Sequence, residues 1–358
     1  LIDDVDFSGA GTIPTLMDVQ QVEVLRGPQG TRYGANALAG LINFSTNEPD
    51  EAFFTSIKLS GGEFGTQTAG VVLNVPISKT LFSRFVFESH ESDGYIENDF
   101  KDSNTTNDRD ELTSRAKFAW QVKENWSLNL SLAFIDVDNG YDAFSLDNNR
   151  HTLSDEPGFD RQNSAYVSLK SSWQLDGIDI DVLWNQSDSD LDYGYDEDWS
   201  FTGIHPWGYT STDHYFRERD TTSAEIRLLS NESGRVFADT TDWVLGLYYL
   251  SSNETLQRQY TFLPSEFLSD YEFDTFAIFT QLDIALSDRT TLSAGLRLEE
   301  RDTEYDDSNE SSFSPDDSFW GGKVSLEYLA GENTLAYGSI SRGYKAGGFN
   351  IDGSLDAD

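Results

Sequence analysis

The residue types most often used in catalysis are scarce in this sequence. Cysteine is absent, and only four histidines occur among 358 residues. No His-x-x-x-His pair and no Gly-x-Ser-x-Gly run is present, so neither a zinc protease nor a serine hydrolase is indicated. The nearest approach to a catalytic pair is His90 with Glu88. We therefore expect no enzyme activity and keep a catalytic barrel only as the remote alternative. The histidines are His90, His151, His205 and His214.

Three aspartates alternate along the chain in a manner similar to a calcium-binding loop. An EF-hand loop needs glycine at its sixth position and a bidentate glutamate at its twelfth. Here the glycine comes one position late, at Gly194, and Trp199 stands where the glutamate belongs. This spacing excludes an EF-hand and leaves two interpretations, a weak surface calcium site or solvated loop charges. The aspartates are Asp188, Asp190 and Asp192.

Aromatic side chains gather between residues 193 and 209, in a stretch that we expect to be a long loop. Ring faces bind bulky ligands with little loss of conformational entropy. We therefore expect this loop to contact a substrate, the alternative being that its rings pack on one another. The expected contacts are Trp199, Phe201, His205, Trp207 and Tyr209.

The elements that would position these residues are β-strands. From about residue 52 onward apolar and polar residues alternate with a period of two, as along residues 126–134, where Trp126, Leu128 and Leu130 share one face. Capped helical patterns are essentially absent. We expect about thirteen strands. They begin near Ala52, Thr66, Thr80, Glu111, Trp126, Arg161, Ile178, Tyr215, Asp242, Phe273, Thr290, Phe319 and Thr334.

The connections between these strands alternate between short and long, which is typical of outer-membrane barrels. Trp126, Trp173 and Trp243 lie beside short turns, where an interfacial aromatic girdle belongs. Because a closed bacterial barrel has an even number of strands, an odd number predicts an incomplete one. The short connections are 76–79, 123–125, 176–177, 231–241, 287–289 and 331–333, and the opposite set is 61–65, 89–110, 138–160, 187–214, 252–271 and 301–318.

Composition supports this class. No apolar run approaches the roughly 18 residues of a membrane-spanning helix. The mean hydropathy of -0.49 fits strands with one wet face. A net charge of -39 argues against nucleic-acid binding, because a polyanion would be repelled. The lack of cysteine is compatible with an oxidising periplasm or cell surface, and nothing in the sequence calls for a cofactor.

A glycine-punctuated segment precedes the strands. It contains Val22-Glu-Val-Leu-Arg-Gly-Pro, then Tyr33-Gly, then Gly40-Leu-Ile-Asn. This ordered set closely resembles the distal plug signature of TonB-dependent outer-membrane receptors. The residues that carry the resemblance are Glu23, Arg26, Gly27, Pro28, Gly30, Tyr33, Gly34, Gly40, Ile42 and Asn43.

A second run, Ser341-Arg-Gly-Tyr-Lys-Ala-Gly-Gly-Phe-Asn, is similar to a mid-barrel motif of the iron-complex receptors in that family. Its residues are Arg342, Gly343, Tyr344, Lys345, Gly347, Gly348 and Phe349. The two resemblances bracket the chain. They imply that residues 1–50 are the end of an α+β plug domain, and that residues 51–358 are the first part of an all-β, antiparallel up-and-down transmembrane barrel. The chain would carry about 13 of about 22 strands.

The resemblance implies a function and partners. The function is TonB-dependent uptake of a ferric siderophore or similar iron complex across the outer membrane of a Gram-negative bacterium. The partners are TonB with its inner-membrane energising complex, the outer-membrane lipid and lipopolysaccharide, and the ligand, with no nucleic acid. A carbohydrate, cobalamin or another scarce nutrient is the alternative cargo. The family's N-terminal coupling box and most of its plug are absent from this sequence.

Other barrel and β-sheet classes fit less well. A passive porin lacks a separate N-terminal plug, and a soluble acidic β-protein would place polar residues on the outer strand faces. By resemblance, Glu23 and Arg26 are expected to lock the plug to the barrel wall, with Glu299 or Glu327 as partners. The alternative is that Arg26 pairs within the plug.

Overall fold

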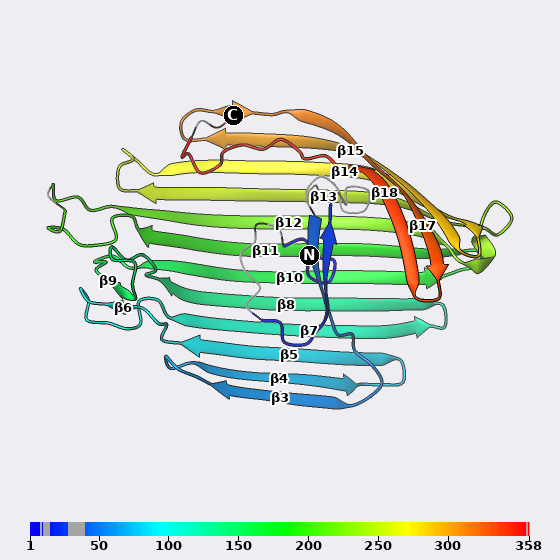
Figure 1. Ribbon diagram of the computed structural model, residues 1–358, viewed down its shortest axis with the longest axis horizontal. Coiled ribbons are helices and arrows are strands. Elements are labelled where there is room, and N and C mark those ends of the chain that lie inside the picture. The colour runs from blue at the N-terminus through cyan, green and yellow to red at the C-terminus, as the bar shows by residue number, and fades with distance from the viewer. Residues whose placement is uncertain (8, 10–14, 28–39, 206, 356, 358) are drawn as a thin grey trace.

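The computed structural model describes residues 1–7, 9, 15–27, 40–205, 207–355 and 357. One antiparallel sheet of 14 strands dominates it (Figure 1). Thirteen strands follow one another as a meander, and the short β16 (Ser312–Phe313) adds to β15. The thirteen are β3 (Phe54–Gly61), β4 (Gln67–Pro76), β5 (Leu81–Ser92), β7 (Arg109–Lys123), β8 (Trp126–Tyr141), β10 (Gly158–Gln174), β11 (Ile178–Asp196), β12 (Thr212–Ser230), β13 (Thr241–Tyr260), β14 (Phe267–Ser287), β15 (Thr290–Asp307), β17 (Asp316–Gly331) and β18 (Thr334–Arg342).

The thirteen expected strands are confirmed, and so is the alternation of their connections. The three longest connections, 93–108, 142–157 and 197–211, lie at one end of the sheet, at the left of Figure 1, and the connections at the other end are tight turns except for 231–240. The largest error in a start is in β14, which begins at Phe267 rather than near Phe273. Strands also extend into the stretches expected to be loops. β11 continues to Asp196 and β13 to Tyr260, because backbone pairing persists after the apolar face has ended.

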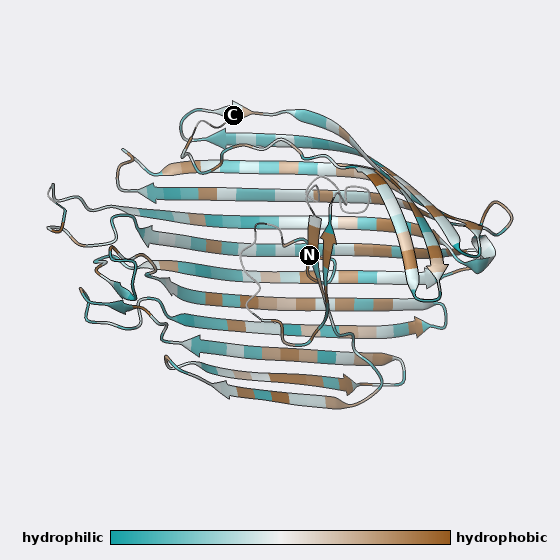
Figure 2. Cartoon of the chain, viewed as in Figure 1, coloured by the Kyte–Doolittle hydropathy of each residue, from teal (hydrophilic) through white to brown (hydrophobic). Residues whose placement is uncertain are grey.

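The sheet has one apolar face and one polar face along the middle of its strands. On β15, Leu296 and Leu298 are exposed, whereas Arg297 and Glu299 between them are buried on the inner side. Exposed apolar side chains form a broad outer belt, which argues against the soluble-protein alternative. Figure 2 shows brown residues mainly in the middle of the strands and toward the tight turns. The belt includes Leu132, Phe134, Leu169, Trp184, Ile226, Leu245, Leu247, Phe276, Ile278, Leu296 and Leu298.

Beyond this belt, toward the long connections, the outer face becomes acidic. On β14 and β15 the register places Asp274 opposite Asp302. The next two pairs on the same face are also like-charged, Glu272 with Glu304 and Asp270 with Asp306. Directly opposed like charges destabilise a sheet. The teal ends of the strands in Figure 2 show the same change of character.

The sheet has two free edges in the part of the chain that the structure describes, β3 and β18. It curls toward β17 and β18 (Figure 1). The structure is thus a curved, open portion of an antiparallel barrel wall. No helix in the described ranges is long and apolar enough to cross a membrane.

The described residues before β3 lie against the inner face of the sheet (Figure 1). β1 (Val19–Arg26) and β2 (Gly40–Thr46) form a hairpin that crosses in front of the central strands (Figure 1). Gly27 and Gly40 flank the intervening segment, and both have positive φ, at 79° and 148°. A side chain at Gly40 would meet the carbonyl of Leu25, so glycine is required there.

Candidate functional site

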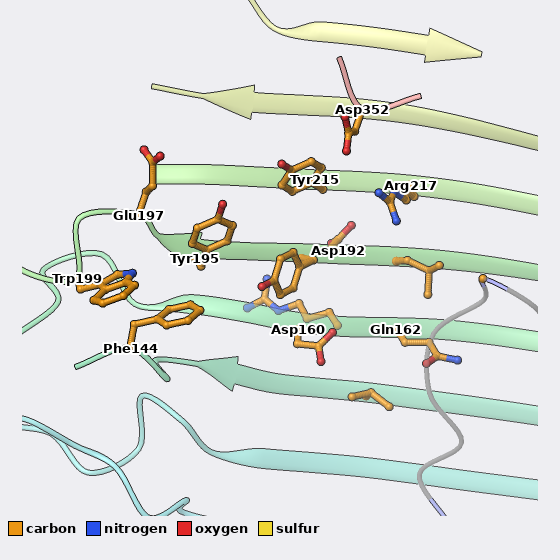
Figure 3. Close-up of a pocket in the computed structure, with 15 residues that line it drawn as sticks. Phe144, Asp160, Gln162, Asp192, Tyr195, Glu197, Trp199, Tyr215, Arg217 and Asp352 are labelled. Atoms are coloured by element: carbon orange, nitrogen blue, oxygen red, sulfur yellow. The ribbon is translucent and has the colours of Figure 1, made fainter. Parts of the chain in front are cut away.

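A cavity of about 790 Å³ opens on the inner face, near the long connections (Figure 3). β10, β11 and β12 form its wall, together with the connections 142–157 and 197–211. The cavity lies beyond the outer apolar belt, because the last exposed apolar outward residue of β11 is Trp184. It is lined by Gly9, Val137, Phe144, Asp160, Arg161, Gln162, Leu191, Asp192, Tyr193, Tyr195, Glu197, Trp199, Tyr215, Arg217 and Asp352.

Aromatic rings form much of this wall. The period of two turns Tyr193 and Tyr195 of β11 to the same face, and the ladder places Tyr215 of β12 opposite Tyr193. Ring centroids are 5.7 Å apart for Tyr193 and Tyr195. Phe144 and Trp199 stack at 5.1 Å with an interplanar angle of 9°, although they come from different connections. The result is a continuous aromatic surface suited to a bulky ligand with flat groups.

Arg217 is the cation of the cavity with spare hydrogen-bonding capacity. Its Nε is buried without a hydrogen-bond acceptor among the described residues, and the nearest paired carboxylate oxygen, on Glu254, is 3.9 Å away. Arg161 is instead engaged by Asp138 at 2.6 Å. Arg258 donates two hydrogen bonds to Asp213, at 2.9 and 2.6 Å. Arg217 is therefore the less tightly paired of the two arginines in the cavity lining.

The tyrosines of this wall are held in their neutral form. Burial raises the pKa of Tyr195, and the nearby carboxylates of Asp213 and Glu197 raise it further. The pKa of Tyr215 is raised by burial and by its hydrogen bond to Asp213. Neutral phenols supply ring faces and hydroxyl donors, not phenolate oxygens for a bare metal ion.

The five aromatic-loop residues expected to contact a ligand lie in different surroundings in the structure. Trp199 lines the cavity. Phe201 stacks on Phe100 at 4.6 Å, and Tyr209 stacks on Phe262 at 5.7 Å. His205 lies beside Tyr209, with Nε2 3.3 Å from the Asp198 carbonyl oxygen. Trp207 is 91% exposed. The substrate role of all five stays a prediction.

Several cavity residues were missed by sequence reasoning. Tyr215 and Arg217 reach Tyr193 only through the register of β11 with β12, and Phe144 reaches the cavity from the connection 142–157. One signal was available in the sequence: Tyr215 and Arg217 are two residues apart on β12, so the period of two places both on the inner face. The aspartates Asp188, Asp190 and Asp192 were expected in a loop but lie within β11, with Asp188 opposite Asp220 and Asp190 opposite Glu218.

Buried ion pairs join the N-terminal segment to the sheet. Asp18 accepts hydrogen bonds from Arg84 at 2.5 and 2.7 Å. Lys117 contacts Asp3 at 3.1 Å and Glu48 at 2.8 Å. The expected lock residue Glu23 instead accepts hydrogen bonds from Gln21 and Asn43, within the β1–β2 hairpin.

The other expected lock and signature residues are placed as follows. Glu299 accepts hydrogen bonds from Arg297 at 2.8 Å and from the Tyr344 hydroxyl at 3.0 Å. Glu327 is exposed. Arg26 ends β1, opposite Gly40, and Ile42 is exposed on β2. Pro28, Gly30, Tyr33 and Gly34 lie outside the described residues.

The mid-barrel run turns back along the inner face. Tyr344 stacks on Phe319 at 5.2 Å, and Phe349 stacks on Tyr305 at 5.0 Å. Arg342 lies over the Trp320 ring at 3.8 Å. Lys345, Gly347 and Gly348 are exposed, and Gly343 is partly buried. The run thus anchors the segment after β18 to β14, β15 and β17.

The barrel portion matches a family model described as TonB dependent receptor-like, beta-barrel, over residues 60–355. The chain belongs to the TonB-dependent receptor family. The pesticin receptor of Yersinia enterocolitica is 27% identical over 373 residues, covering 98% of this chain and 52% of that receptor. The ferric enterobactin receptor PirA of Pseudomonas aeruginosa is 27% identical over 146 residues, 37% of this chain and 20% of that receptor.

Solved structures of TonB-dependent receptors share the fold. The ferric yersiniabactin uptake receptor FyuA from Yersinia pestis superposes with a TM-score of 0.82 at 22% identity, covering 95% of this chain and 55% of that one. The ferripyoverdine receptor of Pseudomonas aeruginosa gives 0.73 at 15%, covering 93% and 48%. The chain spans about half the length of the relatives it matches. The family consists of outer-membrane transport receptors, not enzymes.

Proposed function

We propose that this chain is part of an outer-membrane receptor that imports a ferric siderophore into the periplasm, driven by TonB and its inner-membrane complex. The aromatic cavity with Arg217 carries the proposal. Ring faces provide contact area, and the Arg217 guanidinium in the cavity lining provides charge recognition for an anionic iron complex. Relatives named as ferric siderophore receptors favour this cargo over a sugar or cobalamin.

Orientation and the transport step follow from the same features. The outer apolar belt contacts lipid, and the end with long connections faces the outside, so the cavity is open to the medium. Residues 1–50 act as the end of the plug, held on the wall by Asp18 with Arg84 and by Lys117 with Asp3 and Glu48. Import requires these contacts to be released when TonB pulls on the plug.

The test measures uptake of labelled ferric siderophore under iron limitation. It compares cells that lack the receptor gene with the same cells after the full-length gene has been restored. Each is assayed with and without an uncoupler. We expect uptake that needs both the gene and the proton gradient. Tyr193→Ala should reduce siderophore binding by at least about tenfold, as loss of a buried aromatic contact does. Phe237→Ala, which removes an exposed ring at the opposite end of the sheet, is the matched control.

Three results would overturn the proposal. Iron uptake unchanged by deletion would redirect the search to sugars and cobalamin. Flux independent of the gradient would indicate a passive pore. Equal effects of the Tyr193 and Phe237 variants would show that the binding surface lies outside the cavity.

A further inference from the structure

Two long connections are joined at the rim by a pair of very short strands. β6 (Glu97–Asn98) lies in the connection before β7, and β9 (His151–Thr152) lies in the connection before β10. They pair in parallel, with Glu97 beside His151. The Glu97 N–H donates to the Arg150 carbonyl at 2.8 Å, and the Asp99 N–H donates to the Thr152 carbonyl at 2.9 Å. The backbones of residues 97–99 and 150–152 are therefore fixed against each other.

Three metal-ligating side chains converge on this junction. His151 Nδ1 is 3.2 Å from Asp99 Oδ1 and 3.7 Å from Glu97 Oε2. All three ligand atoms lie within 4.8 Å of one another. In a tetrahedral zinc site, with ligand distances of about 2.0–2.1 Å, two ligand atoms lie roughly 3.3 Å apart. Two of the three separations, 3.2 and 3.7 Å, are close to this value, and the third lies within 4.8 Å.

A buried network holds the junction from below. Asp142 Oδ2 accepts hydrogen bonds from Asn98 Nδ2, Thr106 Oγ1 and Thr152 Oγ1, each at 2.7 Å. Asn98 and Thr152 alternate with the three converging residues, and both are buried. The hydrogen-bonding groups of the inward-pointing Asn98 and Thr152 are thus satisfied. The outward-pointing side chains remain half exposed, at 65% for Glu97, 55% for Asp99 and 51% for His151. A metal ion and its water ligands can reach them.

Charge at the junction also favours a cation. Two carboxylates meet there, and no salt bridge joins either one to an arginine or lysine among the described residues. The neighbouring Arg150 lies over the rings of Tyr95 and Phe64, at 5.7 and 5.9 Å. An imidazole nitrogen among the ligands favours a first-row transition ion over calcium or magnesium, which prefer all-oxygen sites.

We propose that Glu97, Asp99 and His151 bind a zinc-class divalent ion, with water as a fourth ligand, and that the ion clasps the connection 93–108 to the connection 142–157. The second connection carries Phe144, so the clasp would stiffen one side of the cavity rim. The site is distinct from Asp188, Asp190 and Asp192. It does not depend on the identity of the transported ligand.

The first test uses calorimetry to measure zinc binding to the metal-free, full-length receptor in detergent. We expect one zinc ion per chain at this site, and at least about tenfold weaker binding for His151→Ala and for Asp99→Asn. His90→Gln is the matched control, because His90 contacts Thr68 on another part of the wall. X-ray absorption of the bound zinc should show one imidazole nitrogen and otherwise oxygen ligands.

The second test measures the clasp itself by hydrogen exchange. Zinc should slow exchange at residues 97–103 and 150–155 in the wild type and not in His151→Ala. The three side chains are on the surface, so these substitutions leave the fold intact, and thermal unfolding without zinc verifies this. Equal zinc affinity of wild type and His151→Ala, or zinc protection that persists in the variant, would overturn the proposal. In that case the cluster is only an exposed ion pair.

Discussion

Asp18 and Arg84 lie 66 residues apart in the sequence, and their side chains form a two-pronged ion pair on the inner face of the sheet. Each side chain is more than nine-tenths buried. Two charges taken out of water in this way are tolerated only as a pair. The contact therefore makes the position of the N-terminal segment depend on one arginine of β5.

Replacing Arg84 with alanine should loosen that segment. Asp18 would keep its hydrogen bond from Asn47 but lose its only ion-pair partner among the described residues, at a cost of about 3–5 kcal/mol. Hydrogen exchange of residues 15–27 and 40–50 would report the change. Arg235→Ala removes an exposed pair with Asp242, worth about 0–1 kcal/mol, and is the control. Equal exchange in both variants would contradict the prediction.

Ligand binding should depend on Arg217 more than on Arg161. Among the described residues, the Arg217 guanidinium has only a long ion pair, 3.9 Å to Glu254, whereas Arg161 binds Asp138 at 2.6 Å. Removing one hydrogen bond to a charged group costs about 1.5–3 kcal/mol, which is about 10- to 100-fold in affinity. We expect a loss of this size for Arg217→Gln and little change for Arg161→Gln, measured with ferric siderophore and purified full-length receptor. A larger loss of affinity for Arg161→Gln than for Arg217→Gln would show that Arg217 does not bind the ligand.

Stability should respond to pH through Asp196. This side chain is buried at the end of β11, one of its oxygens has no partner among the described residues, and burial raises its pKa to about 6. Between its ordinary pKa, near 4, and about 6, the folded protein holds a proton that the unfolded chain has released. Stability contributed by this proton is therefore lost as the pH rises from about 4 to about 6.

Asp196→Asn should flatten this part of the pH profile and stabilise the connection 197–211 above pH ~6. Thermal unfolding in detergent across this range would measure it. The exposed Asp239, changed to Asn, serves as the control. A profile unchanged by Asp196→Asn would show that another group is responsible.

The hydroxyl of Tyr344 should contribute to anchoring the mid-barrel run. It donates to the buried Glu299, which Arg297 also contacts. Tyr344→Phe keeps the ring stacked on Phe319 and leaves one acceptor less satisfied, at a cost of about 1–3 kcal/mol. Tyr337→Phe removes an exposed hydroxyl and should be neutral. The difference in unfolding temperature of the two variants decides the matter.

The strands could be predicted because lipid and lumen impose opposite chemistries on alternate residues. Where that contrast ends, prediction failed. Beyond Trp184 the outward residues of β11 become Asp188 and Asp190, so both faces are polar, yet the backbone remains paired with β12. The alternation of apolar and polar residues that indicates a strand therefore ends before the strand itself does. Loops expected at these ends were consequently too long.

The cavity was only partly predictable for a related reason. Trp199 could be singled out from local aromatic content, but Tyr215 reaches the same wall through a cross-strand register with Tyr193. Ion pairs between distant segments pose the same difficulty. Nothing in the residues around Asp18 indicates Arg84 as its partner, whereas the resemblance pointed to Glu23, which the hairpin itself satisfies.

The opposed carboxylates of β14 and β15 make salt a structural component. Residues facing each other across an antiparallel pair are about 5 Å apart. At 0.15 M salt the screening length is about 8 Å, so Asp274 and Asp302 still repel each other, but at 1 M it falls to about 3 Å. The pairing of β14 with β15 near the long connections should therefore be most stable at high salt concentration and less stable as the salt concentration falls.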